Sequence, residues 1–309
     1  MPRSGLPPDV TGTIVTVGTF DGVHLGHQDV IRRLVARGEA AGLRSLLVTF
    51  EPHPLEIVNP AIAPKLLTPG REKLDALAAT GLDYVAVVPF TPTLAAYEAH
   101  EFVDLVLRDR FRMRELLIGH DHGLGRGRTG DVAVLSALGD VRGFPVDVVE
   151  PVVAEHGDAP VSSSVIRRSV EKGELGAVEE ALGRPYSIAG TVVHGDHRGR
   201  TIGFPTLNVV PESPRKLLPA SGVYAVEVQT PTGPYPGMMN LGPRPTVGDA
   251  RVSIEAHLFD VDGDWYGAHV RIDLVARLRD VRRFASLDDL VAQLGDDRDA
   301  ARVSLTARR

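Results

Sequence analysis

Two histidines stand at a glycine-rich turn near the start of the chain, where their spacing suits the binding of an anion. The segment GTFDGVHLGHQ contains Gly18, Gly22 and Gly26, which allow a backbone to approach a ligand closely. His24 and His27 are three residues apart, so a helix that begins there turns both rings to one side. Their ring N–H groups and the free N–H groups of the helix start then meet at one place.

Such a site suits the attack of a phosphate on the α-phosphorus of ATP. The attacking phosphate is already ionised, so the reaction needs no general base. It needs donors aimed at the charge that builds up in the transition state, and two histidines supply them. The alternative is a pair that only caps the helix, and the three glycines favour the anion site over it.

A second anion site is predicted in the segment VSSSVIRRSVEKGEL. Ser162, Ser163 and Ser164 can cap a helix whose free N–H groups hold a phosphate. Arg167 lies one turn further along and would reach the same anion. Serine-rich caps are common, so this segment taken alone favours a plain helix cap.

The segment HGDHRGRTIGFPTLN predicts a phosphate loop that leads into a strand. Thr206 and Asn208 alternate with Leu207 and therefore project to one face of that strand. A hydroxyl and a carboxamide are hard oxygen ligands, which suit Mg²⁺ bound to a nucleotide. The backbone N–H groups of the loop can cover the phosphates because the loop contains three glycines, Gly195, Gly199 and Gly203. A glycine-rich hairpin with a polar face is the alternative.

Glu255 is the candidate general base. In the segment SIEAHL the apolar face is formed by Ile254, Ala256 and Leu258, so Glu255 and His257 point the other way. An alcohol must lose a proton when it accepts a phosphate, and a carboxylate is the usual acceptor. Without the loop upstream, a solvent-facing strand residue would be the simpler interpretation.

The elements that position these residues fall into two patterns. Short apolar runs at 13–17, 45–50, 84–89, 116–118 and 146–149 alternate with amphipathic helices, which predicts a parallel sheet covered on both faces. A helix is expected from residue 163 to about 182. From Tyr186 onward, β-branched segments split by Gly and Pro predict an antiparallel barrel of about six strands, followed by a helix that Ser286 caps. The predicted domains are 1–183 and 184–309.

Composition narrows the class of protein. A length of 309 residues with 43% hydrophobic residues can build two cores, and a net charge of -6 argues against a nucleic-acid partner. The chain has no Cys, which excludes disulfides and thiolate metal sites. No apolar run is long enough for a signal peptide or a membrane span, so we expect a soluble cytoplasmic protein of undetermined oligomeric state without membrane partners.

The first half resembles the nucleotidyltransferase superfamily in GTFDGVHLGHQ and in SSSVIR, where Ser164 replaces the usual Thr. FEPHP, LLTPGREK and IGHDHGLGRGRTGD resemble its FAD synthetase branch. The resemblance implies a Rossmann-like fold in which Phe20 and the neighbouring glycines bind ATP, and in which Asp121, His122 and Leu124 contact the flavin. The branch usually has aromatic residues at positions 122 and 124, so these two are departures.

The second half resembles riboflavin kinase from Tyr186 to Arg302, in motifs that include HGDHRGRTIGFPTLN, NLGPRPT and IEAHLFD. The resemblance implies that Thr206 and Asn208 hold Mg²⁺ and phosphates, that Glu255 is the base, and that Asn240 contacts the flavin. For Arg244, ligand binding and a structural role stay equal alternatives. Leu207 replaces the usual Ala of this motif.

The order of the two halves resembles the bacterial bifunctional riboflavin kinase/FAD synthetase family. That resemblance implies small-molecule partners only: ATP and riboflavin give FMN, and ATP and FMN give FAD and pyrophosphate. One alternative keeps only the kinase active, with a degenerate nucleotide-binding first domain. Others are an adenylyltransferase for a different phosphorylated substrate with a non-catalytic barrel, and a flavin sensor or carrier without catalysis.

Overall fold

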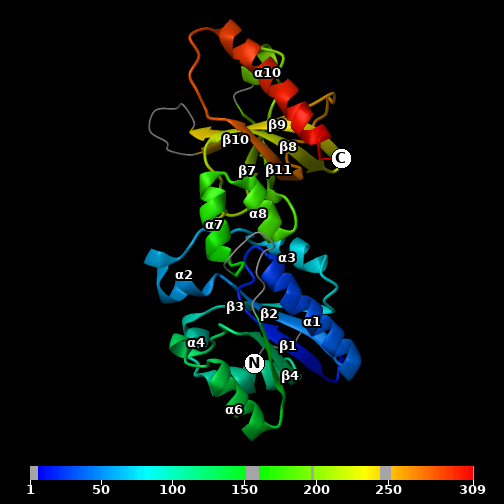
Figure 1. Cartoon of the computed structure of the whole chain (residues 1–309), viewed down its shortest axis with the longest axis vertical. Coiled ribbons are helices and arrows are strands. Elements are labelled where there is room, and N and C mark those ends of the chain that lie inside the picture. Colours follow the sequence, from blue (N-terminus) through cyan, green and yellow to red (C-terminus); the bar gives the residue numbers. More distant parts are fainter. Residues whose placement is uncertain (1–5, 151–159, 196–197, 244–251, 309) are drawn as a thin grey trace. The chain divides into compact units, whose positions relative to one another are not determined.

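The computed structural model describes residues 6–150, 160–195, 198–243 and 252–308. The chain divides into two compact units, Met1–Ser163 and Ser164–Arg309, whose elements are labelled in Figure 1. Each unit has its own sheet and its own hydrophobic core. The first is a parallel α/β unit and the second a closed antiparallel barrel with a C-terminal helix, so the predicted fold class is confirmed.

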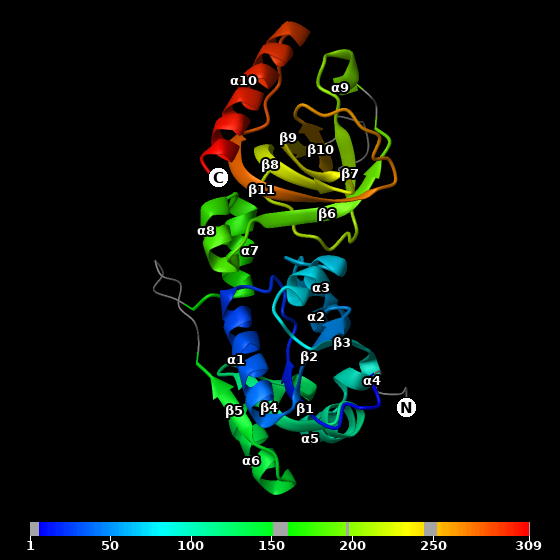
Figure 2. The ribbon, with the colours of Figure 1, turned by 90° about the vertical axis from the view of Figure 1, so that its right-hand side faces the viewer.

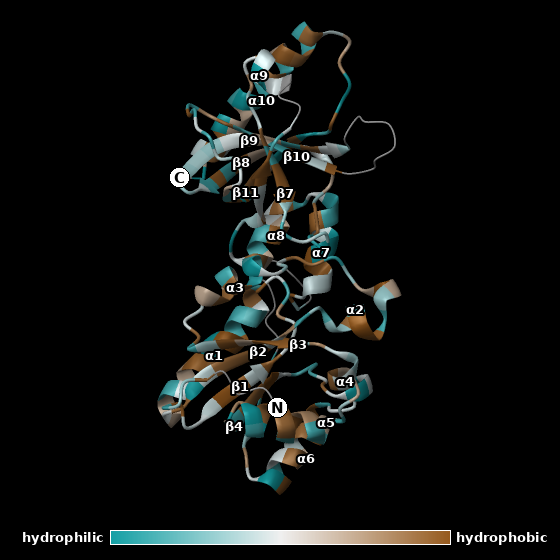
Figure 3. Ribbon diagram, turned by 180° about the vertical axis from the view of Figure 1, so that it is seen from behind, coloured by the Kyte–Doolittle hydropathy of each residue, from teal (hydrophilic) through white to brown (hydrophobic). Residues whose placement is uncertain are grey.

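The sheet of the first unit has the strand order β3-β2-β1-β4-β5, and each neighbouring pair is parallel. The order places β1 at the centre, next to β2 and β4. Its residues are all buried, and the inner strands are drawn in the apolar colour in Figure 3. The strand bounds are β1 Thr13–Val17, β2 Arg44–Glu51, β3 Tyr84–Pro89, β4 Met113–Gly119 and β5 Val146–Val149.

Helices cover both faces of this sheet because successive strand residues point to opposite sides. Ile14 packs with Leu34 of α1 on one face, and Val15 packs with Val103 of the π-helix η2 on the other. The helical elements of this unit are α1 Leu25–Ala41, α2 Pro54–Val58, η1 Pro60–Ile62, α3 Arg71–Ala78, α4 Pro92–Ala95, α5 Ala99–Glu101, η2 Phe102–Arg110, η3 Arg126–Arg128 and α6 Val132–Arg142.

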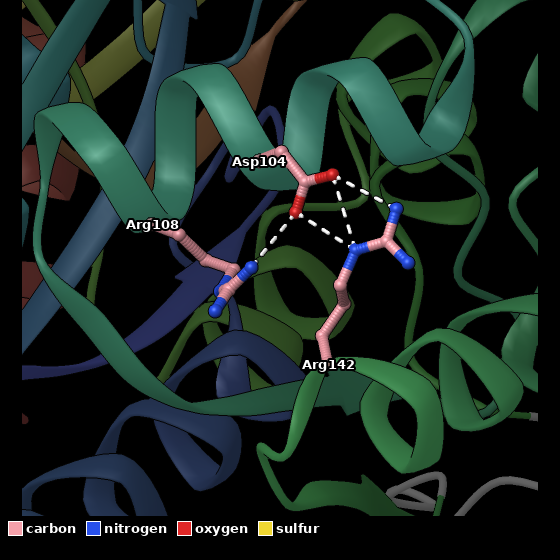
Figure 4. A network of polar contacts seen from close by, with 3 residues as sticks. All are labelled: Asp104, Arg108 and Arg142. Carbon is pink, nitrogen blue, oxygen red and sulfur yellow. Dashed lines mark hydrogen bonds and ion pairs between the residues drawn. The ribbon is translucent and has the colours of Figure 1, made fainter.

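A network of charges ties η2 to α6 (Figure 4). The Asp104 carboxylate accepts hydrogen bonds from Arg108 Nη1 at 3.0 Å and from Arg142 Nη2 at 3.1 Å. Burial opposes the ionisation of Asp104, but the hydrogen bonds from Arg142 and Arg108 outweigh it and hold the pKa of the carboxyl below its usual value. The network fixes the last turn of α6 against the helix that covers the sheet.

The barrel of the second unit closes in the order β10-β7-β6-β11-β8-β9. Its interior is filled by apolar residues of alternating strand positions, among them Ile254, Ala256 and Leu258. The bounds are β6 Tyr186–Val193, α9 Arg198–Thr201, β7 Leu207–Pro211, β8 Gly222–Thr230, β9 Gly233–Pro243, β10 Val252–Leu258 and β11 His269–Arg279.

The helix expected over residues 163–182 is two helices, α7 Ser163–Lys172 and α8 Leu175–Leu182. Gly173, at φ +76°, separates them because left-handed backbone ends a helix. Leu175 of α8 belongs to the barrel core, and α8 packs against β6 and β11. The compact second unit therefore begins at Ser164, before residue 183. The boundary at residue 183 stays a prediction of where one activity ends and the other begins.

The C-terminal helix α10 (Leu287–Thr306) lies along the outside of the barrel in Figure 2. Ser286 caps it as expected, accepting the Asp289 backbone N–H at 3.1 Å. Ala301 and Leu294 of this helix pack with apolar residues of the barrel, whereas Leu287 at its start is 59% exposed. A buried ion pair also anchors it: Arg279 of β11 donates through Nε, at 2.8 Å, and through Nη2, at 2.6 Å, to the two oxygens of Asp297, which is 3% exposed.

We predict that Asp297→Asn destabilises the barrel unit by about 3 kcal/mol, because breaking a buried pair leaves the partner charge uncompensated. Asp299→Asn on the same helix removes an exposed pair with Arg298 and is expected to cost about 0.5 kcal/mol or less. Urea unfolding followed by the fluorescence of Trp265, the single Trp and a barrel-core residue, measures this unit selectively. Equal effects of the two changes would contradict the anchoring role.

Candidate functional site

The turn after β1 is held in place by one buried carboxylate. Asp21, 3% exposed, accepts the backbone N–H groups of Leu67 at 3.1 Å and Thr68 at 3.0 Å. Thr68 in turn accepts the Gly22 N–H through its hydroxyl at 2.8 Å. The Ser163 hydroxyl donates to the Asp21 carbonyl at 2.9 Å. Segments far apart in sequence therefore converge on the glycine-rich turn.

The turn itself has an unusual backbone. Phe20 and Val23 adopt φ values of 48° and 42°, a region that costs free energy for residues with a side chain, and most for a β-branched one. Both side chains are buried, so packing holds them there. Gly18 and Gly26 leave room for rings: a Cβ would lie 2.9 Å from the Phe20 ring and 3.2 Å from the His24 ring, respectively.

The structure brings His24 and His27 together, as the spacing predicted. His24 is the N-cap of α1, and its Nδ1 accepts the His27 backbone N–H at 3.3 Å. The two rings stack with centroids 3.6 Å apart, and the Phe20 ring lies 4.8 Å from that of His27. Because Nδ1 of His24 accepts this hydrogen bond, a neutral His24 ring carries its proton on Nε2.

His27 is held in its neutral form. Burial, the neighbouring His24 and the charge of Lys73 all lower its pKa well below the ordinary value. Its Nδ1 is buried and has no hydrogen-bond partner among the described residues. The ring is thus neutral, and it has a buried polar atom without a partner among the described residues. A contact with a ligand would explain such an atom.

Lys73 belongs to this site, although its motif was noted and its role was not predicted from the sequence. Its Nζ donates to Thr49 Oγ1 at 3.1 Å and, at 3.4 Å each, to the carbonyl oxygens of Thr19 and Phe50. Burial lowers the pKa of this ammonium, and Asp21 and Glu51 offset part of the effect. A single charged residue outside every predicted strand gave no periodic pattern that would have revealed it.

The serine segment is only partly placed at this turn. Ser163 begins α7 and, as described above, contacts the Asp21 carbonyl. Ser162 precedes the helix, while Ser164 and Arg167 lie on α7 and belong to the second compact unit. A joint site of Arg167 with the two histidines therefore stays a prediction.

The predicted flavin loop follows β4. Asp121 is exposed, and its carbonyl accepts a hydrogen bond from Arg128 at 2.9 Å. Burial lowers the pKa of His122 to about 4, with a smaller contribution from Arg128, and its buried Nε2 has no hydrogen-bond partner among the described residues. Leu124 is 7% exposed, lies in the hydrophobic core and pairs with Gly130. Leu124 therefore offers a ligand little surface, whereas His122 offers a polar atom.

On the barrel, Glu255 lies between two carboxamides. The register places Glu255 of β10 opposite Asn208 of β7 on one side and opposite Asn240 of β9 on the other. Directly opposed residues point to the same face, with Cβ atoms about 5 Å apart. Because Ile254 and Ala256 fill the interior, the three polar side chains share the outer face. Sequence analysis had assigned each of them separately but not this alignment.

Two glycines of the predicted phosphate loop lie against the metal-binding candidates. A Cβ at Gly195 would overlap the Asn208 carboxamide, and one at Gly199 would overlap the Phe204 carbonyl and lie 3.5 Å from Thr206 Oγ1. Gly203, at φ +83°, follows the short helix α9. His257 fixes the end of this segment, since its Nδ1 lies 2.7 Å from the Pro205 carbonyl. Arg244 lies outside the described residues.

The donors present suit a divalent cation that arrives with phosphates. The hydroxyl of Thr206 and the carboxamide oxygen of Asn208 are hard ligands, and the described residues contain no group of three or more His, Asp or Glu positioned as a metal site. Mg²⁺ characteristically takes only one or two ligands from a protein and completes its octahedron with water and nucleotide oxygens. The pair therefore fits Mg²⁺ held by a nucleotide.

Two family models match the chain, one over each half. The FAD synthetase model matches residues 6–165 and the riboflavin kinase model matches residues 182–305. The first match contains the histidine turn and Lys73, and the second contains Asn208, Asn240 and Glu255.

Among the described helices, none has the length and apolar character that crossing a membrane requires.

Curated relatives match over nearly their whole length. Proteins named bifunctional riboflavin kinase/FMN adenylyltransferase are 42% identical in Escherichia coli K12, over 94% of this chain and 92% of that protein, and 38% identical in Pseudomonas fluorescens, over 96% and 94%. The protein of the same name from Bacillus subtilis is 34% identical over 94% and 91%.

One solved structure has the same fold over the full chain. It is titled macrolide-efflux protein from Streptococcus pneumoniae, is 29% identical, and aligns with a TM-score of 0.85 over 98% of this chain and 97% of that one. The efflux activity in its title matches neither family model. The similarity supports the order and the architecture of the two units.

We predict that His122 makes the stability of the first unit depend on pH. Its folded pKa of about 4 lies below the ordinary 6.5, so the unfolded chain binds more protons between these values, and stability falls as the pH drops from 6.5 to 4. His122→Phe should flatten this dependence. Calorimetric scans at several pH values measure it, and His100→Gln, which replaces an exposed histidine, is the control. An unchanged pH slope in His122→Phe would contradict the burial of a neutral ring.

Proposed function

The chain belongs to the family of bifunctional riboflavin kinases/FMN adenylyltransferases, and we infer from this that it phosphorylates riboflavin to FMN and adenylylates FMN to FAD, with ATP as the donor in both reactions. The observation that carries this inference is the match of one catalytic family model to each half, in the order of the full-length relatives. We propose residues 1–183 for adenylylation and 184–309 for phosphorylation.

For adenylyl transfer, we propose that the histidine turn binds ATP and stabilises the transition state. An oxygen of the FMN phosphate forms a bond to the α-phosphorus, and the bond to the departing pyrophosphate breaks. His24 and His27 donate to the oxygens on which charge accumulates, and Ser163 and Arg167 are proposed as further phosphate ligands. Gly18, Phe20 and Gly26 shape the turn, and Asp121 and His122 are proposed to contact the flavin.

The neutrality of His27 suits this reaction. Neither histidine has to remove a proton, because the attacking phosphate is already an anion. A neutral imidazole donates one hydrogen bond in a fixed direction and takes no proton from the nucleophile. The pKa of His27, lowered first by burial, supports the role of donor and argues against that of base.

For phosphoryl transfer, we propose Glu255 as the general base. The riboflavin hydroxyl gives its proton to the Glu255 carboxylate while its oxygen bonds to the γ-phosphorus and ADP departs. Asn208 and Asn240 flank the carboxylate in register and orient it. Thr206 and Asn208 would hold Mg²⁺, which neutralises phosphate charge when bound, and Asn240 is also proposed to contact the flavin. A cytoplasmic location remains a prediction of the sequence.

The experiment that tests the division of labour starts from riboflavin and Mg-ATP, with FMN and FAD separated by chromatography. The unaltered protein is expected to form FMN and then FAD. His27→Ala should slow FAD formation by roughly 10² to 10³, the cost of one transition-state donor, while FMN accumulates. His100→Ala, an exposed histidine of the same unit, serves as the control. Equal loss of both products in a folded His27→Ala protein would defeat the two-site assignment.

Glu255→Gln is predicted to lower the rate constant of FMN formation by roughly 10² to 10⁴, because the base is lost while the shape of the side chain is retained. The affinities for riboflavin and ATP should change little. Glu227→Gln alters another barrel carboxylate, on β8, which is in register with neither Asn208 nor Asn240. FAD formation from added FMN should persist in both variants. Near-normal phosphorylation of riboflavin by Glu255→Gln would remove the base assignment.

A further inference from the structure

Lys73 carries a buried positive charge among neutral partners. The residue is 9% exposed, and its Nζ donates to a hydroxyl and two carbonyl oxygens at 3.1 to 3.4 Å. Within the described part of the chain, no carboxylate forms an ion pair with it. Asp21 and Glu51 offset only part of the burial effect on its pKa, and a charge removed from water without a direct ion-pair partner costs free energy. A buried group with such a perturbed charge is a candidate for a role in function.

The position of this ammonium is at the ligand-binding edge of the sheet. Its partners are Thr19, which follows β1, and Thr49 and Phe50 at the end of β2. The Thr49 hydroxyl also donates to the Thr19 carbonyl at 3.1 Å. Hydrogen bonds therefore connect the ends of β1 and β2 with each other and with Lys73 of α3. In parallel α/β sheets ligands bind outside the carboxyl ends of the strands, and the turn to His24 starts here.

The charge of Lys73 also reaches the histidine site. Together with burial and His24, it lowers the pKa of His27, which means that its field acts on that ring. The same field that disfavours a second positive charge favours a negative one. The neutral imidazole of His27 supplies a directed donor without a net charge, whereas adenylyl transfer concentrates negative charge on the α-phosphate and the pyrophosphate.

We propose that Lys73 is a positioning residue for adenylyl transfer, a fixed positive charge behind His27 that attracts the phosphates of ATP and favours the anionic transition state. This rests on the proposed function of the first unit. The ammonium acts through the potential at the His27 site and through the backbone of Thr19. The triphosphate adds negative charge to that of Asp21 and Glu51, so the electrostatic cost of burying Lys73 falls further when ATP binds.

The test compares Lys73→Gln, which keeps a donor but loses the charge, with Thr49→Val, which loses a hydrogen-bond partner but keeps the charge. With FMN and Mg-ATP supplied, Lys73→Gln should lower kcat for FAD formation on the order of 10- to 100-fold, and Thr49→Val by less than about threefold. In Lys73→Gln the pKa of His27, followed by NMR, should rise. A rate equal to that of Thr49→Val, or an unmoved His27 pKa, would overturn the proposal.

Circular dichroism reports whether the first unit of Lys73→Gln is folded, and phosphorylation of riboflavin in the same preparations reports whether the second unit is intact. If the unaltered protein forms no FAD, the proposed function itself fails; if it does and Lys73→Gln matches it, only the role of Lys73 fails. If Lys73→Gln does not fold, a measurement on the unaltered protein tests the role of Lys73. NMR of its ¹³C-labelled lysines, with inorganic pyrophosphate at a concentration that inhibits FAD formation, should show a raised Lys73 pKa. An unchanged value would overturn the proposal.

Discussion

The buried carboxylate of Asp21 is the interaction on which the first site depends. It fixes the backbone of Leu67 and Thr68, and Thr68 in turn holds Gly22, so the strained turn cannot relax away from the start of α1. The positive φ values of Phe20 and Val23 persist because packing and these hydrogen bonds together over-determine them. The consequence is that His24 caps α1 and stacks on His27 in a fixed arrangement, which is what preorganised electrostatic stabilisation requires.

In the barrel, the register between strands positions the candidate site, as the buried carboxylate does in the first unit. Three adjacent strands align Asn208, Glu255 and Asn240 in one row, and a slip by one residue would turn all three into the core. The tight fit of Gly195 over Asn208 then fixes the loop relative to that row. The chemistry of the second site thus follows from the same alternation that fills the barrel interior with Ile254 and Ala256.

Local sequence patterns predicted most of the fold, and most of the features that they did not predict depend on contacts between residues far apart in the chain. Apolar runs predicted the five parallel strands because the strands of a parallel sheet that helices cover on both faces are mostly apolar, and the alternation after Tyr186 predicted the barrel. The break at Gly173 was missed because a glycine between two amphipathic segments is also tolerated within one helix. The Asp297–Arg279 anchor and the contacts of Lys73 join residues 18 to 54 positions apart, and no periodicity encodes such pairs.

The two proposed sites differ in charge because their nucleophiles differ: one is a phosphate and the other an alcohol. A phosphate that attacks ATP is already ionised, so a base beside it would only add repulsion between anions, and the proposed first site accordingly combines the neutral imidazole of His27 with a buried ammonium. An alcohol has to lose its proton, so the second site needs a carboxylate, and the carboxylate needs neutral neighbours that do not compete with it for that proton. Asn208 and Asn240 meet this condition, whereas a lysine in either position would pair with Glu255, the proposed base, and make it a weaker proton acceptor.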